Sequence, residues 1–243
     1  MDDFPPSTAE YSMEYVHIEA ALKSRWCPFL ALVEEIKKFE PRPLSSYSDY
    51  RSRELTRLRG LNPGATDDSL LEIIDRQIAT FVDPNFQFHE KFSERLMAEY
   101  VTVAFLSHAL CEAAINAILA IGLAQGKTYE LFNLVERADI KEKWQYAPKI
   151  LQASYELPRG SSMFGNLTYL TKQRNALVHH KIQIHVDGKK VLDGSRFNRE
   201  SYPDSLQWIR RFFSLPYDLV DHARKFLMPE FPIFVLMDRK PID

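Results

Sequence analysis

The sequence predicts an all-α protein with one small β-hairpin. Apolar residues recur at helical spacing over most of the 243-residue chain, and glycine, which weakens helices, occurs only eight times. No internal repeat or low-complexity tract interrupts this pattern. The spacing of apolar residues changes from helical to alternating at one place. There Ile182, Ile184 and Val186 alternate with other residues before the turn-forming pair Asp187-Gly188. We therefore expect helices along the chain and a hairpin here.

Residues 1–88 are expected to form a helical extension that packs on the rest of the protein. Residues 8–39 predict helix with a break near Cys27-Pro28, because proline can open a helix but cannot continue one. A loop and a short polar helix ending at Gly60 follow. The next helix, about residues 69–81, has its apolar residues at helical spacing: Leu70, Ile73, Ile74, Ile78 and Phe81.

Residues 89–243 are expected to form the main helical domain, which carries the hairpin and a C-terminal tail. A long helix is predicted over 89–124, and two more over 128–137 and 139–154. Pro158-Arg159-Gly160 then breaks the chain, and Ser161 or Ser162 can cap the helix that follows. A last helix over 203–226 should be bent or split at Pro216. The tail "EFPIFVLMD" predicts either a short strand or a docked extended segment.

Composition and local features indicate a cytoplasmic protein. Two cysteines cannot form a disulfide framework for a chain of this length, and the acidic start "MDDFPPSTAE" is unlike a signal peptide. The most membrane-like stretch, 103–124, holds His108, Glu112 and Asn116 near its middle. A mid-membrane acid costs about 2.5–3.5 kcal/mol, so this stretch is interpreted as a buried core helix with no membrane partner.

Positive charge is concentrated in one part of a chain whose net charge is only −2. Residues 171–211 hold nine lysines and arginines against four acids, a local +5 that leaves −7 for the remainder. A basic segment on an acidic body is typical of a local anion site. A solvated charged face would give the same pattern.

The segment "YLTKQRNALVHHK", residues 169–181, combines groups suited to phosphate chemistry. Histidine titrates near neutrality and can act as acid or base, and arginine binds phosphate oxygens with two parallel hydrogen bonds. On an ideal helix Asn175 and His179 lie about 40° apart, so they share a face, whereas Arg174 lies about 140° from His179. His180 offers an alternative spacing. Basic residues at a helix C-terminus also stabilise the helix dipole, which would explain them without any function.

The chain resembles the HEPN superfamily (higher eukaryote and prokaryote nucleotide-binding domains). The residues that carry this resemblance are Arg174, Asn175, His179 and an earlier acid, Glu112 in "HALCEAAIN". The resemblance covers about residues 90–225. It implies a compact, mostly antiparallel helical bundle whose final core helix carries Arg-polar-x-x-x-His. It also implies a homodimer that brings two copies of the motif into one cleft.

Members of that family are often metal-independent endoribonucleases, and the resemblance implies the same activity here. His179 would be the general acid or base, Arg174 the phosphate-binding cation and Asn175 the positioning hydrogen-bond partner. The 2′-hydroxyl would attack the phosphate, which restricts the substrate to RNA and leaves a 2′,3′-cyclic phosphate. Bacterial defence, a toxin-like role with an antitoxin or regulatory partner, or RNA processing would be the setting.

Two further groups of residues support this hypothesis, each with a structural alternative. His108, Glu112 and Asn116 recur every four residues on one helix face, and Glu112 is expected to pair with Arg174. A core ion pair would look the same from the sequence. The lysines expected along the RNA backbone are equally compatible with solvated positions that protect strand edges; they are Lys172, Lys181, Lys189 and Lys190.

Other common site motifs do not occur in the sequence. It contains no glycine-rich phosphate loop, no Cys/His zinc spacing and no serine-nucleophile elbow, so no metal and no cofactor are expected. The alternative to a ribonuclease is a non-catalytic interaction or dimerisation module. In such a module Arg174 and His179 would hold the bundle or its dimer together.

Overall fold

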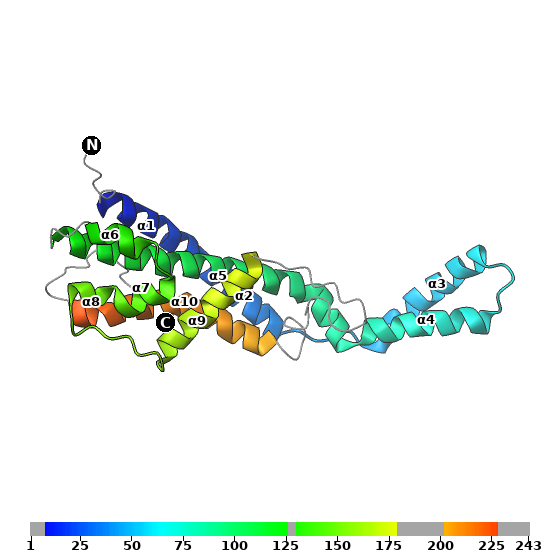
Figure 1. The fold of residues 1–243 in the computed structure, drawn as a ribbon. Helices are drawn as coiled ribbons and strands as arrows, with labels where there is room; N and C mark the ends of the chain where they lie inside the picture. The colour runs from blue at the N-terminus through cyan, green and yellow to red at the C-terminus, as the bar shows by residue number, and fades with distance from the viewer. Residues whose placement is uncertain (1–7, 126–129, 179–201, 228–243) are drawn as a thin grey trace. The chain divides into compact units, whose positions relative to one another are not determined.

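The computed structural model describes residues 8–125, 130–178 and 202–227, and these contain helices but no strand. The all-α class is therefore confirmed for the described part of the chain (Figure 1). The expected hairpin after the motif helix and the tail "EFPIFVLMD" lie outside the described residues.

The chain divides into two compact units, which are described separately. Among the described residues, the first unit takes in 8–30, 99–125, 130–178 and 206–227, and the second takes in 31–98 and 202–205. Three helices contribute to both units: α2 (Trp26–Lys37), α5 (Pro84–Gln125) and α10 (Tyr202–Leu227). The α1 helix (Thr8–Ser24) lies in the first unit, whereas residues 31–88 lie in the second.

The first unit is a helical bundle. Besides α1 and parts of α2 and α5 it contains α6 (Glu130–Glu136), α7 (Ile140–Tyr146), α8 (Pro148–Leu151), α9 (Ser162–Val178) and most of α10 (Tyr202–Leu227). Its core is supplied largely by α5 and α10, whose fully buried side chains include Val103, Leu110, Ile115, Leu119, Phe212, Phe213 and Leu219. Burial of these side chains is the main source of the unit's stability.

Trp144 and Gly122 fix α7 and α8 against α5. The indole Nε1 of Trp144 donates a hydrogen bond to the Cys111 carbonyl oxygen on α5 (3.0 Å), and the Tyr155 hydroxyl donates to the Trp144 carbonyl oxygen (2.8 Å). Gly122 leaves room for the side chain of Leu151, which a Cβ at that position would meet directly. Specific hydrogen bonds and close packing therefore hold both short helices in place.

Proline positions explain where the helices differ from expectation. The first break falls at Arg25, and Pro28 lies in the first turn of α2, where its missing N–H has no intrahelical partner to lose. The single helix expected over 139–154 is two helices, because Pro148 begins α8. The last helix is not split at Pro216, and α10 continues through that residue.

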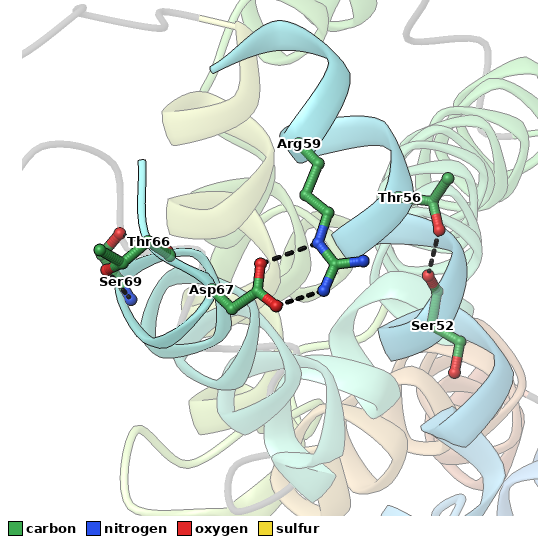
Figure 2. A network of polar contacts seen from close by, with 6 residues as sticks. All are labelled: Ser52, Thr56, Arg59, Thr66, Asp67 and Ser69. Carbon is green, nitrogen blue, oxygen red and sulfur yellow. Dashed lines mark hydrogen bonds and ion pairs between the residues drawn. The ribbon is translucent and has the colours of Figure 1, made fainter. Parts of the chain in front are cut away.

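The second unit contains a helical hairpin, in which α3 (Ser48–Leu61) packs along α4 (Asp67–Val82) after a short 3₁₀ turn, η1 (Leu44–Tyr47). The α4 helix buries Leu70, Ile74 and Ile78, whereas α3 buries none of its residues. Polar contacts close the connection between the helices (Figure 2). The Arg59 guanidinium makes a two-pronged ion pair with the Asp67 carboxylate, and Thr66 caps α4.

The helix α5 is the one described helix that is long and apolar enough to cross a membrane by length and composition. Most of its apolar window is buried inside the structure, as in the core helix of a soluble protein, so the span test is weak evidence for a membrane.

Candidate functional site

The motif helix α9 begins where the sequence predicts and is anchored on one side. The Phe164 amide donates to the Ser161 Oγ (3.2 Å), so Ser161 is the capping residue. The buried side of α9 consists of Leu167, Leu170, Thr171 and Gln173. The helix ends at Val178, immediately before His179.

Aromatic packing fixes α9 against α10. The rings of Tyr169 and Trp208 stack with their centroids 3.8 Å apart, and the Arg211 guanidinium lies 4.7 Å from the Trp208 centroid. Stacked aromatic rings and cation–π contacts of this kind each contribute about 0.5–1.5 kcal/mol. The helix that presents the motif is therefore held at a defined position on the bundle.

Three of the predicted motif residues lie in the described part of the chain. Arg174 is half-buried, Asn175 and Lys172 are exposed, and the Arg174 Nη1 donates to the Asn175 Oδ1 at 3.0 Å. This hydrogen bond holds one guanidinium nitrogen against the side chain of the neighbouring residue. The other predicted site residues of this region lie outside the described residues: His179, His180, Lys181, Lys189 and Lys190.

The polar stripe on α5 has a partner that sequence reasoning missed. Lys143 on α7 is 1% exposed, and its Nζ donates to the Asn116 Oδ1 (3.0 Å) and to the Glu112 Oε1 (3.4 Å). The Glu112 side chain remains 44% exposed. A buried ammonium needs such partners, because its desolvation would otherwise cost several kcal/mol. The signal was present in the sequence, since Lys143 lies on the same helix face as the buried Ile140, Trp144 and Ala147.

Two more polar residues, His108 and Asp139, belong to the same region as Glu112, Asn116 and Lys143. His108 is buried, and this burial is the largest cause of the lowered pKa of its imidazole. The positive charge of Arg174 lowers the pKa further. The carboxylates of Glu112 and Asp139 act in the opposite direction. The helices α7 and α9 pack against each other, and the charge of Arg174 on α9 lowers the pKa of His108 on α5, so we group Arg174 with the stripe of α5. We call the following residues the polar cluster: His108, Glu112, Asn116, Asp139, Lys143 and Arg174.

The ion pairs of the polar cluster differ from the expected one. Glu112 pairs with Lys143 and not with Arg174, because Lys143 reaches it from the neighbouring helix α7. The Asp139 Oδ1 accepts a hydrogen bond from the Lys141 amide (2.9 Å) and so caps α7. The same oxygen lies 3.6 Å from the Lys141 Nζ. Within the described residues each acid of the cluster therefore has a lysine partner, whereas the Arg174 guanidinium has no carboxylate partner there.

The described residues contain no group of three or more His, Cys, Asp or Glu side chains placed to hold a metal ion. The chemical groups that the cluster does offer are a half-buried guanidinium, a buried imidazole and a partly exposed carboxylate. Comparison of the chain with family models, with curated proteins and with solved structures finds no match. Any functional conclusion therefore depends on the residues themselves.

The buried His108 makes a testable contribution to the pH dependence of stability. Its pKa is lower in the folded protein than in the unfolded chain, so the folded state binds fewer protons once the pH falls below about 6.5. Stability contributed by the neutral ring is complete above that pH and is lost as the solution is acidified. We expect His108→Gln, which cannot titrate, to show a smaller loss of unfolding free energy between pH 7.5 and pH 5.5, measured by urea denaturation. An unchanged pH profile would contradict this assignment.

Proposed function

We propose that the protein is a metal-independent endoribonuclease of the HEPN type, acting on RNA as a homodimer in the cytoplasm. The observation that carries this proposal is the guanidinium of Arg174. It is a half-buried member of the polar cluster, and within the described residues it has no carboxylate partner. An arginine with that environment is suited to bind a phosphate oxygen and to stabilise the charge that develops on it.

The proposed reaction uses the residues around that arginine. His179 follows the last residue of α9 and would exchange the proton with the 2′-hydroxyl or the leaving oxygen, with His180 as the alternative. Asn175, held by Arg174, would orient the phosphate. The O2′ forms a bond to phosphorus as the bond to O5′ breaks, and the departing O5′ takes up a proton. Lys172, exposed on the same helix, and the lysines after it would bind the RNA backbone.

The test is cleavage of single-stranded RNA by the purified protein in excess chelator. We expect products with 2′,3′-cyclic phosphate ends, and we expect His179→Ala to abolish their formation. The matched control is the same oligonucleotide with deoxyribose at the cleaved positions, which has no nucleophile and should remain intact. Cleavage of that control, or cleavage that stops when chelator is added, would contradict the mechanism.

The second candidate is a non-catalytic interaction module. The observation in its favour is that the Arg174 guanidinium donates, within the described residues, to its own neighbour Asn175. The described residues therefore show no acid or base in hydrogen-bond contact with the guanidinium, as a non-catalytic surface would also have it. Absence of cleavage over varied RNAs, together with a folded and dimeric protein, would favour the module over the enzyme.

A further inference from the structure

Lys143, which the sequence pattern did not single out, is a buried cation of the polar cluster. Its side chain is 1% exposed, and its ammonium contacts Asn116 and Glu112 at 3.0 and 3.4 Å. A pair that served only packing could be replaced by apolar side chains at little cost or even with a gain in stability. The partner of the buried lysine, however, is a carboxylate that is 44% exposed at the edge of the polar cluster.

The carboxylate of Glu112 has a second possible partner nearby. Glu112 lies one helical turn after His108 on α5, and α9, which carries Arg174, packs against α7, which carries Lys143. The charge of Arg174 lowers the pKa of His108, which agrees with this arrangement. A glutamate released from Lys143 would be attracted to the guanidinium, and the resulting pair would neutralise the cation that a phosphate needs. Asp139 does not compete in this way, since it caps α7 and lies 3.6 Å from Lys141.

We propose that Lys143 is a positioning residue that holds the Glu112 carboxylate away from Arg174 and so leaves the guanidinium open to an RNA phosphate. This inference rests on the proposed function. In this arrangement the buried ammonium of Lys143 neutralises the carboxylate of Glu112. The guanidinium of Arg174 therefore stays available to bind a phosphate.

The test is a set of three variants, Lys143→Met, Glu112→Gln and the double variant. Binding is measured by fluorescence anisotropy with a short 2′-O-methyl RNA, which cannot be cleaved by 2′-hydroxyl attack. We expect Lys143→Met to weaken binding roughly tenfold, because a released carboxylate opposes the phosphate. The double variant should bind nearly as tightly as the wild type, because the glutamine amide has no charge to place on Arg174. Lys149→Met, an exposed lysine on α8, is the matched control and should bind normally.

A purely structural lysine would give a different result. Loss of affinity in Lys143→Met that Glu112→Gln does not reverse, or an unchanged affinity in a folded Lys143→Met protein, would overturn the inference. Lys143→Arg keeps the charge and should retain most of the binding, which provides a second check if the methionine variant folds poorly.

A second readout separates this inference from the proposed function. The pKa of the His108 imidazole depends on the charges of Arg174 on α9, Glu112 on its own helix and Asp139 at the start of α7, and its titration can be followed by NMR without RNA. We expect Lys143→Met to change the pKa of His108 and the double variant to reverse most of that change. If the wild type binds no RNA, the proposed function is wrong, and the NMR result alone decides whether Lys143 controls the Glu112 charge.

Discussion

Arg174→Ala should lower kcat/KM for RNA cleavage by about 10²–10³-fold while the melting temperature stays nearly unchanged. The guanidinium would stabilise charge that develops on the phosphate, and that contribution is lost with the side chain. The folded protein loses little, because the hydrogen bond that Arg174 makes within the described residues is to the exposed Asn175. We expect a change in unfolding free energy of about 0.5 kcal/mol, as for other surface substitutions.

The matched control is Arg53→Ala on α3. Arg53 is exposed and, like the half-buried Arg174, makes a local hydrogen bond, from its Nε to the Asp49 carbonyl oxygen (3.3 Å); its loss should leave cleavage unaffected. Arg174→Lys keeps the charge but not the two-pronged geometry, so an intermediate rate is expected. Equal cleavage by wild type and Arg174→Ala would remove Arg174 from the reaction. A fall in activity that parallels a fall in melting temperature would favour a structural role.

Trp144→Ala should cause the largest loss of stability among single substitutions at the site's supporting helices, roughly 3–5 kcal/mol. Trp144 is 0% exposed, so its removal leaves a large cavity between α7 and α5. The Cys111 carbonyl oxygen also loses the hydrogen bond from the indole. Because α7 carries Lys143, the same change should loosen the polar cluster.

Chemical denaturation of Trp144→Ala, Trp144→Phe and Tyr146→Ala measures these contributions. Trp144→Phe retains much of the volume but not the indole donor, so its loss should be smaller, about 1–3 kcal/mol. Tyr146 lies on the same helix but is 46% exposed, and its removal should cost no more than about 1 kcal/mol. Similar losses for Trp144→Ala and Tyr146→Ala would show that α7 is not held through the indole.

The helices were predictable because their apolar residues follow the helical period and their ends carry capping residues or prolines. The spacing of Leu70, Ile74 and Ile78 predicted α4, and all three are buried. The effect of a proline was less predictable, because it depends on packing around it. Pro148 separates two short helices, but α10 continues through Pro216, where the adjacent Leu215 and Tyr217 are buried and hold the chain in place.

The candidate site was predictable only in part. The sequence identified Arg174 and the stripe containing Glu112, because arginine beside asparagine and acids on an apolar helix are unusual patterns. It assigned the wrong partner to Glu112, since a lysine among other charged residues reads as solvated. The helical spacing of Lys143 with Ile140 and Trp144 indicates that it faces inward, but only the three-dimensional structure shows that it reaches Glu112 and Asn116 on α5. Pairing between distant helices has no signature in a single sequence.

The helix α3 buries none of its residues and depends on α4 for its position. Most of its side chains can therefore be exchanged without opening a cavity, so α3 should tolerate many substitutions during evolution. Three residues that contact α4 are exceptions: Tyr50 donates a hydrogen bond to Gln77 and packs on Phe81, Arg51 pairs with Asp75, and Arg59 pairs with Asp67 at the turn. Among homologues, therefore, substitutions in this hairpin should accumulate on α3 and should change Arg51 and Arg59 together with their acidic partners on α4.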